Sequence, residues 1–399
     1  MNEPVTIRHL TPKNFLSFGP ENPGIELKAL NVLIGPNGCG KSNFIEALNF
    51  MRASTGEFRE VIRNGGGVQE WTWKGGKEAP SVLCNVLCNV DDIEGPSNYS
   101  HLVQFGRQGQ QFYLLEERIE EFGNKESGPE LNLKYSFHDE INPTFSYFQE
   151  SKIQKYTPNF KQFSRNQSIL AQSANSDSVF HLTSLFFAYR SIRIYRDWPF
   201  GSKSTLRDPQ KVDSRSDYLQ EDFSNLAIYL NRIKVQFPKA KRAILEGLGE
   251  LYPGIDNFEV LVEGGSVQLY LIEGDYNISA TRLSDGTLHY LCLLAILCDP
   301  EPPAVICIEE PEVGLHPDVL PYLAQLLISA SERTQLIVTT HSDVLVDSLT
   351  EKPETVVVCS KEEGQTKMER LSSENLKEWL KDYRLGELWT RGHIGGNRW

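Results

Sequence analysis

A glycine-rich octapeptide near the start of the chain contains the residue types that hold phosphate groups. Residues 35–42 read Gly-Pro-Asn-Gly-Cys-Gly-Lys-Ser and match the pattern G-x-x-x-x-G-K-[ST] at every fixed position. The three glycines permit backbone angles that turn successive N–H groups toward phosphate oxygens. We expect Lys41 to reach the β- and γ-phosphates of a nucleotide and the Ser42 hydroxyl to bind Mg²⁺. The candidate nucleotide-binding residues are Gly35, Pro36, Asn37, Gly38, Cys39, Gly40, Lys41, Ser42 and Asn43.

Two adjacent carboxylates follow a second apolar segment, far along the chain. The residues at 305–308 are apolar, and Glu309 and Glu310 come directly after them. A carboxylate at a strand tip beside a phosphate loop is where Mg²⁺ needs a second protein ligand. We therefore assign Glu309 to the metal and Glu310 to orienting and polarising the attacking water. A solvated acidic turn is the alternative interpretation.

Hydrophobic periodicity predicts the elements that must position these groups. Residues 29–34 predict a buried strand before the phosphate loop, and residues 42–51 predict an amphipathic helix after it. Near the end of the chain, predicted strands at 304–308 and 335–339 alternate with helices. This alternation predicts a parallel sheet with ligands at the carboxyl ends of its strands.

The middle of the chain has a mixed character. Residues 82–89 and 101–115 predict strands of an antiparallel meander, whereas residues 180–194 and 226–248 predict helices. Residues 156–178 are rich in Ser, Gln and Asn and predict a mobile connector. Cys84 and Cys88 form a close pair, but no second Cys/His pair lies nearby to complete a zinc site, so strand residues are the favoured interpretation.

Taken in this order, the motifs resemble those of the ABC-type ATPase superfamily, in the branch that contains RecF, the SMC proteins and the OLD-like ATPases. Members carry the phosphate loop, a signature resembling LSGGQ, a strand that ends in two acids and a switch histidine. Here the signature is Leu283-Ser284-Asp285-Gly286-Thr287. The switch histidine is His341, in Thr339-Thr340-His341-Ser342. The segment from Trp198 to Arg207 and the ending from Leu385 to Gly396 look like those of stand-alone ATPases of this branch.

The resemblance implies ATP and Mg²⁺ as cofactors and an active site shared by two chains. Ser284 and the Gly286 N–H would contact the γ-phosphate of ATP bound by a partner subunit in a head-to-tail dimer or a higher oligomer. His341 would contact the γ-phosphate in its own chain, and a capping role at a strand end is its alternative. His316 takes the place of an aspartate that usually reaches across the dimer.

Two positions make the metal site less regular than in most relatives. Glu309 stands where an aspartate is commoner, and it lengthens the side chain by one methylene. A glutamine usually joins Mg²⁺ to the inserted lobe in these enzymes, and Gln69 is the candidate here. An ordinary polar residue after a glycine turn is its alternative.

The expected fold is α/β: an ABC-type P-loop core, with a mixed sheet flanked by helices and a large inserted α/β lid between the phosphate loop and the signature. The expected regions are 1–80 (first half of the core), 81–275 (inserted lid), 276–360 (second half of the core) and 361–399 (C-terminal extension). The formal net charge of −13 argues against a basic nucleic-acid coat, so binding of DNA would need a local groove. The candidate cluster is Arg190, Arg193, Arg196, Lys203, Arg207, Lys211 and Arg215, with a solvated face paired with Asp197, Asp208 and Asp213 as the favoured alternative.

Three functions are compatible with these patterns. The leading one is an ATP-switched scaffold or sensor, with slow hydrolysis, that controls a separately encoded effector in antiphage defence. The second is a RecF/SMC-like ATPase that repairs DNA or binds DNA ends. The third, the energy subunit of a transporter, is least favoured because the stretch between Ser42 and Leu283 is too long. Neither a signal peptide nor a membrane span is recognisable, and seven scattered cysteines favour the reducing cytoplasm. We expect no separate nuclease domain after His341.

Overall fold

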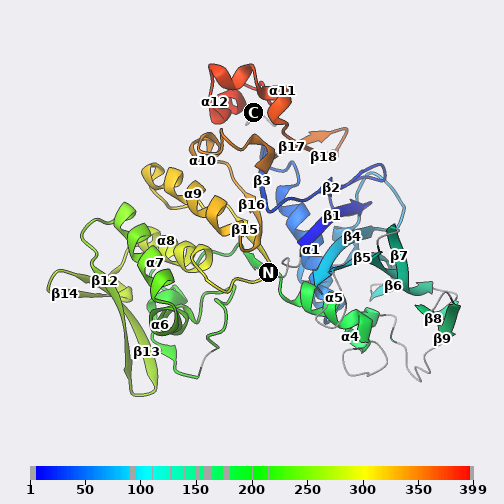
Figure 1. The fold of residues 1–399 in the computed structure, drawn as a ribbon, viewed down its shortest axis with the longest axis horizontal. Helices are drawn as coiled ribbons and strands as arrows, with labels where there is room; N and C mark the ends of the chain where they lie inside the picture. Colours follow the sequence, from blue (N-terminus) through cyan, green and yellow to red (C-terminus); the bar gives the residue numbers. More distant parts are fainter. Residues whose placement is uncertain are drawn as a thin grey trace. The chain divides into compact units, whose positions relative to one another are not determined.

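The chain forms two structural units, and each combines segments that are distant in the sequence (Figure 1). The first unit contains Met1–Ile192 with Val357–Arg370, and the second contains Arg193–Val356 with Leu371–Asn397. The structure is a computed structural model. It describes residues 6–89, 96–109, 111–125, 128–138, 141–149, 152–156, 164, 166–173, 180–199, 201–213 and 215–395.

An eight-stranded sheet with antiparallel neighbours dominates the first unit. In sheet order its strands are β2 (Ile25–Glu26), β1 (Thr6–Lys13), β4 (Ser81–Asn89), β5 (Pro96–Gln108), β6 (Gln111–Lys125), β7 (Gly128–His138), β8 (Ile141–Gln149) and β9 (Lys152–Tyr156). The predicted meander is therefore confirmed, and Cys84 and Cys88 are buried residues of β4. The sheet starts before the phosphate loop and continues through the region expected to be inserted.

The phosphate loop connects a buried strand to an amphipathic helix, as predicted. Strand β3 (Leu30–Ile34) is buried throughout and neighbours β17 (Val356–Glu362), which pairs with β18 (Gln365–Arg370). Helix α1 (Lys41–Ala53) follows the loop and buries its apolar face. The buried positions include Phe44, Ile45, Leu48 and Met51, which repeat at the spacing of one helix face.

Shorter helices complete the first unit: α2 (Phe58–Asn64), α3 (Val68–Trp71), α4 (Ile169–Ser173) and α5 (Phe180–Arg190). Helix α4 lies inside the stretch 156–178, where the sequence predicted only a connector. The fully buried Glu117 carboxylate of β6 explains this order, because it accepts hydrogen bonds from the Ser168 hydroxyl and from the Ile169 N–H. Residues 157–163, 165 and 174–178 of that stretch lie outside the described part of the chain.

Parallel strands carry the acidic and histidine motifs of the second unit. Strand β15 (Val305–Glu309) pairs in parallel with β10 (Arg193–Tyr195) and with β16 (Gln335–Thr339). The helix predicted over 180–194 was wrong at its end: α5 stops at Arg190, and Ile194 belongs to β10. Ile194 joins a strand because β10 pairs with the buried strand β15. This pairing provides the backbone hydrogen bonds that these residues would otherwise form within a helix.

Helices α8 (Asp285–Leu297) and α9 (Leu320–Ala330) lie beside these strands (Figure 1). Helix α6 (Leu226–Gln236) packs against a small antiparallel sheet, and α7 (Pro238–Leu251) packs against α6 and α8. The sequence predicted one helix over 226–248. Pro238 divides it, because proline has no N–H and is favoured at the first helical position. The small sheet contains β11 (Gln210–Lys211), β12 (Asn257–Glu263), β13 (Ser266–Glu273) and β14 (Tyr276–Ser279).

The last part of the chain contributes to both units. Strand β18 belongs to the first, whereas α11 (Ser373–Leu376) and α12 (Leu385–Thr390) belong to the second. The Asp347 carboxylate of α10 (Asp343–Asp347) accepts a 2.7 Å hydrogen bond from the Gly386 N–H and so fixes α12 to α10. Gly396, part of the family-like ending, lies outside the described residues. Among the helices that the structure describes, none combines the length and the apolar character that a membrane crossing needs.

Candidate nucleotide site

The phosphate loop can adopt its conformation only with glycine at two of its positions. Gly35 has φ 146°, and a Cβ atom there would lie 2.2 Å from the Cys359 carbonyl oxygen of β17. Gly40 has φ 108°, and its Cβ would lie 2.1 Å from the Thr366 Oγ1 of β18. At Gly38, φ is 75° and nothing lies within 4 Å of a Cβ. Packing thus excludes side chains at two of the glycines, whereas the backbone conformation alone favours glycine at the third.

Lys41 is buried in the loop and bonded to its main chain. Its Nζ donates to the carbonyl oxygens of Gly35 at 2.7 Å and of Pro36 at 3.1 Å. Helix α1 starts at Lys41 without a capping side chain at Gly40, so the positive end of the helix faces the loop. A cradle closed to side chains, a buried ammonium and a helix N-terminus fit a bound polyphosphate.

Two hydroxyl groups that the sequence analysis missed hold the loop in place. Thr366 Oγ1 donates to the Cys39 carbonyl oxygen at 2.7 Å and lies 2.6 Å from Ser17 Oγ. The Asn43 amide, a predicted nucleotide ligand, donates to the same Ser17 oxygen at 2.7 Å. Thr366 is separated from Cys39 by 327 residues, so no local pattern could have identified it.

The loop cysteine has an unusual neighbour. The Cys39 thiol is buried beside the Cys359 thiol, and its sulfur lies 3.8 Å from Lys41 Nζ. The hydrogen bond from Cys359 lowers the pKa of Cys39 to about 6, against the opposing effect of burial and with the help of the Lys41 charge. The same shared proton, together with burial, raises the pKa of Cys359 well above its ordinary value. Within this thiol pair, the thiolate form is therefore favoured at Cys39 over Cys359.

The structure places Gln69 on α3, in the first unit. With the side-chain amide oriented to satisfy its neighbours, the Gln69 oxygen accepts hydrogen bonds from the Arg107 guanidinium of β5. Its backbone carbonyl accepts from Lys74 Nζ at 2.7 Å. Gln69 and Arg107 line a pocket of about 540 Å³ with Lys74 and Lys77. A metal-binding role for Gln69 stays a prediction.

Glu309 ends β15 and is held by the segment that follows β10. The Arg196 Nε lies 3.2 Å from a Glu309 carboxylate oxygen. The Trp198 indole N–H donates to the Glu309 carbonyl oxygen at 2.8 Å, and its ring centroid lies 3.9 Å from that of His289, with the two rings tilted by 45°. Burial lowers the pKa of His289 to about 4, so this ring is neutral near pH 7. A carboxylate oxygen fits Mg²⁺, but here it is already paired with a cation of its own unit.

Glu310 and His341 lie together at the ends of two adjacent parallel strands. A Glu310 carboxylate oxygen lies 3.6 Å from His341 Nε2. Glu310 has φ 48°, an uncommon value for a side-chain-bearing residue, and its N–H donates to the Thr339 carbonyl at 3.0 Å. Strained backbone of this kind costs about 1–3 kcal/mol and is concentrated at functional sites. The turn after β15 thus directs the Glu310 carboxylate toward the His341 ring, which follows β16.

Glu312 is a further acid of this turn that the sequence analysis did not assign. Its carboxylate accepts a 2.6 Å hydrogen bond from the His341 N–H. Burial raises the pKa of Glu312, and the bond from His341 opposes that shift. Glu312 thus fixes the backbone of His341, whereas the Glu310 carboxylate lies close to the His341 ring. The sequence feature that could have identified Glu312 was its position two residues after Glu310, with Pro311 between them.

The signature starts helix α8 and lines a pocket of about 420 Å³ in the second unit. Ser284 is the N-cap, and its hydroxyl accepts a 3.0 Å hydrogen bond from the Thr287 N–H. A Cβ at Gly286 would lie 2.7 Å from the Gly314 carbonyl oxygen, so packing requires glycine there. His316 lines the same pocket and is two-thirds exposed. The structure therefore brings Ser284, Gly286 and His316 together in one pocket, and their contacts with a second chain stay a prediction.

Replacement of Gly40 by alanine should destabilise the protein more than replacement of Gly38. We expect Gly40→Ala to lower the free energy of unfolding by about 2 kcal/mol or more, because strain and overlap with Thr366 add. Gly38→Ala, with open space around it, should cost about 1 kcal/mol. Urea unfolding of both variants measures the difference, and equal losses would contradict the packing argument.

The Cys39 thiol should make stability depend on pH. Its folded pKa of about 6 is below the value of about 8.5 for an unfolded thiol, so its contribution is complete above the unfolded value and is lost as pH falls through 6. We expect the difference in unfolding free energy between wild type and Cys39→Ala to grow from pH 6 to pH 8. Urea titrations at each pH measure it. Cys292→Ala is the control, since burial raises the pKa of that thiol and the difference should stay constant.

Comparison with known proteins identifies a matching family and solved structures of similar fold. Residues 30–347 match the family described as "AAA domain, putative AbiEii toxin, Type IV TA system". No curated protein matches the sequence. An Smc head bound to the C-winged helix domain of ScpA is 15% identical, with a TM-score of 0.52, over 92% of this chain and 99% of that chain. An Smc head from Pyrococcus furiosus, with an extended coiled coil and the C-terminal domain of ScpA, has the same identity and TM-score over 95% and 99%.

These findings decide the fold and the family. The likeness to the Smc heads confirms the expected fold, a mixed α/β P-loop ATPase of the ABC type with sheets flanked by helices. The family match spans the phosphate loop, the signature, the acidic strand and the switch histidine. The chain therefore belongs to the AbiEii-type AAA-domain family, and its fold is that of the P-loop ATPase heads of Smc proteins.

Proposed function

We propose that this chain binds and slowly hydrolyses ATP with Mg²⁺ in a head-to-tail dimer, and that the ATP-bound assembly controls a separate effector protein. The contact between Glu310 and His341, 3.6 Å apart on a strained turn, is the observation that carries the proposal. A carboxylate and an imidazole that face each other can orient a water molecule and accept its proton. The proposed reaction is ATP and water to ADP and phosphate.

Each predicted residue has a role in this reaction. The loop N–H groups and Lys41 bind the phosphates, and Glu310 and His341 position the attacking water. Ser42, Glu309 and Gln69 are the proposed ligands of Mg²⁺, which neutralises charge on the phosphates. For Glu309 to bind the metal, its ion pair with Arg196 has to loosen. Competition between Arg196 and Mg²⁺ for this carboxylate is one physical reason to expect slow turnover.

The signature residues support a site shared by two chains. Ser284 and Gly286 line an open pocket at the positive end of α8, where they can receive the γ-phosphate of ATP bound by a second copy. His316, exposed in the same pocket, can contact that copy. ATP would then join the two chains, and hydrolysis would release them.

The family supports the proposal that this chain controls a separate effector in antiphage defence. The family description names a toxin and a toxin–antitoxin system. The two similar Smc heads were each solved with a domain of ScpA bound. By analogy, a nucleotide-dependent assembly of this chain would present or withdraw a surface for its own partner in the cytoplasm.

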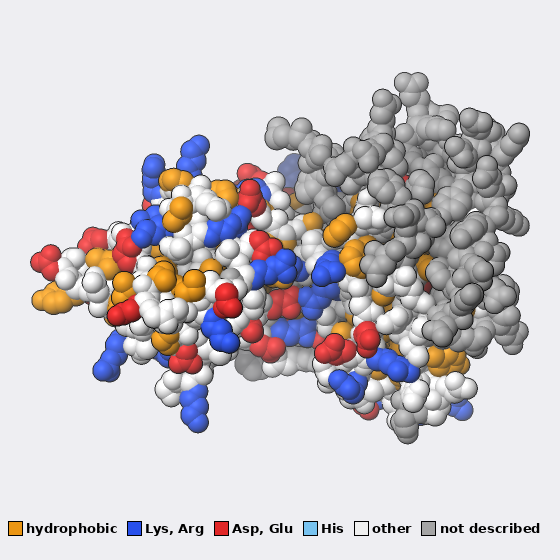
Figure 2. Space-filling model, turned by 90° about the horizontal axis from the view of Figure 1, so that it is seen from below, with side chains coloured by type: hydrophobic (Ala, Val, Ile, Leu, Met, Phe, Trp, Pro, Cys, Tyr) orange, Lys and Arg blue, Asp and Glu red, His pale blue; other side chains and the backbone are white. Residues whose placement is uncertain are grey.

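DNA binding is the second candidate, and the contacts of the arginine cluster weaken it. Among the described residues, Arg196, Arg207 and Arg215 form ion pairs with Glu309, Asp285 and Asp217, partners other than the aspartates expected from the sequence. Arg193 lies over the Tyr218 ring at 3.9 Å. Figure 2 shows basic and acidic side chains interspersed on the face that it draws. Filter binding of duplex DNA at several salt concentrations tests this candidate, because phosphate contacts would make affinity fall steeply with salt.

Replacement of Glu310 by glutamine should separate hydrolysis from assembly. We expect Glu310→Gln to lower phosphate release by about 100-fold or more, because the amide cannot accept the proton of the water. The phosphate loop is unchanged, so the variant should keep or strengthen ATP-dependent assembly. Phosphate release and the mass of the particles with ATP and Mg²⁺ measure both effects.

Two further variants control this experiment. Lys41→Ala should lose ATP binding and assembly together, and Glu332→Gln, an exposed acid beyond α9, should behave as wild type. If Glu310→Gln hydrolyses ATP like wild type, the assignment of Glu310 is wrong. If neither wild type nor Glu310→Gln changes in particle mass when ATP and Mg²⁺ are added, the proposed dimer is wrong.

A further inference from the structure

The signature contains an aspartate where the LSGGQ pattern has glycine. Asp285 lies between Ser284 and Gly286, the two residues proposed to receive a γ-phosphate. A carboxylate so close to a phosphate would repel it, because both groups carry negative charge. The signature of this chain therefore needs a positive partner that its glycine-containing relatives do not need.

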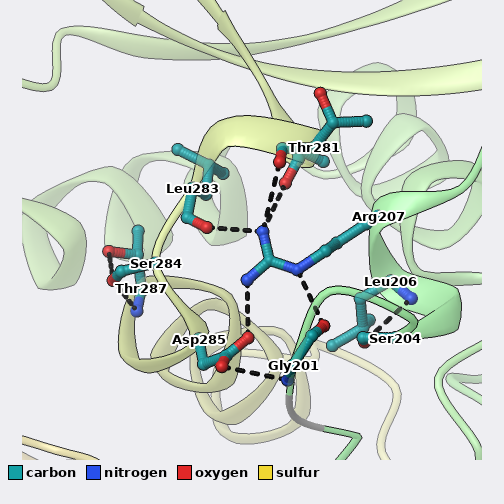
Figure 3. Close-up of polar contacts among 10 residues, drawn as sticks. Gly201, Ser204, Leu206, Arg207, Thr281, Leu283, Ser284, Asp285 and Thr287 are labelled. Carbon is teal, nitrogen blue, oxygen red and sulfur yellow. Dashed lines mark hydrogen bonds and ion pairs between the residues drawn. The ribbon is translucent and has the colours of Figure 1, made fainter.

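Arg207 is that partner (Figure 3). It ends the short 3-10 helix η2 (Thr205–Arg207), and only about an eighth of its side chain is exposed. Its Nη2 lies 2.5 Å from one Asp285 carboxylate oxygen. The other Asp285 oxygen accepts a 2.9 Å hydrogen bond from the Gly201 N–H. The hydrogen bond from Arg207 lowers the pKa of the Asp285 carboxyl, so this acid stays ionised.

The same guanidinium group fixes the main chain that leads into the signature. Nη1 donates to the Leu283 carbonyl oxygen at 2.6 Å and reaches the carbonyl oxygens of Ala280 at 3.3 Å and Thr281 at 3.4 Å. Nε donates to the Gly201 carbonyl oxygen at 3.1 Å. The planar Arg207 guanidinium, which has five N–H donors, thus forms hydrogen bonds with one carboxylate and four carbonyl oxygens. A lysine has the charge but lacks this fixed arrangement of donors.

We infer that Arg207 is the positioning residue of the signature: it neutralises Asp285, turns its carboxylate toward Gly201 and holds the Leu283 turn so that Ser284 and Gly286 can receive a phosphate. This inference rests on the proposed binding of ATP between two copies. Arg207 acts through the signature and not through the phosphate loop, which belongs to the other unit. Its loss should therefore affect assembly without affecting the binding of ATP by the chain's own loop.

The test uses the full chain in the Glu310→Gln background, where ATP-bound assemblies persist. We expect Arg207→Ala to raise the ATP-dependent dimer dissociation constant at least 10-fold, measured by sedimentation, and Arg207→Lys to raise it less. The affinity for a fluorescent ATP analogue should change less than twofold. Thermal unfolding of each variant shows that it is folded. Arg215→Ala, which removes an exposed arginine of the same segment paired with Asp217, is the matched control and should assemble normally.

A second substitution tests the charge argument. In the Arg207→Ala variant the Asp285 carboxylate loses its positive partner while it remains between the two residues proposed to receive the phosphate, so Arg207→Ala/Asp285→Asn should recover part of the lost assembly. No recovery would contradict the pairing of the two residues, and normal assembly by Arg207→Ala would overturn the inference. Failure of Glu310→Gln itself to assemble with ATP would instead refute the proposed dimer. The two failures are thus distinguishable.

Discussion

Carboxylates that work beside the phosphates of a nucleotide need a positive partner or a hydrogen-bond donor within the protein, because phosphate repels them. Three acids of the second unit each lie close to a basic side chain. Glu309 pairs with Arg196, Glu310 faces His341, and Asp285 pairs with Arg207. Arg196 and Arg207, two members of the cluster that resembled a surface for DNA, are therefore paired with acids of the sequence motifs in their own unit.

The two units solve different physical problems. In the first, the phosphate loop is held by close packing: β17 and β18 leave no room for a side chain at Gly35 or Gly40, and Thr366 bonds the loop carbonyl. In the second, the turn after β15 is held in a strained conformation at Glu310. Close packing thus fixes the loop of the first unit, whereas a strained backbone fixes the turn of the second.

The sequence predicted individual strands and helices correctly where the hydrophobic pattern alone decided the local structure. The apolar run before the phosphate loop became β3, and the 3.6-residue repeat after it became α1. The sequence reasoning failed where tertiary contacts outweighed local propensity. Ile194 joined a strand because β15 offered backbone partners, and α4 formed beside a buried Glu117 carboxylate. Pro238 was visible in the sequence, but its division of the predicted helix was not taken into account.

The sequence by itself determined where the motifs of this protein lie, because the phosphate loop, the paired acids and the signature are each contiguous and depend on local backbone geometry. Only the tertiary structure decided which residues hold these motifs in place. Arg207 is 78 residues from Asp285, and Trp198 is 111 residues from Glu309. Contacts over such distances are set by chain topology and packing, which leave no periodic or compositional pattern near either residue.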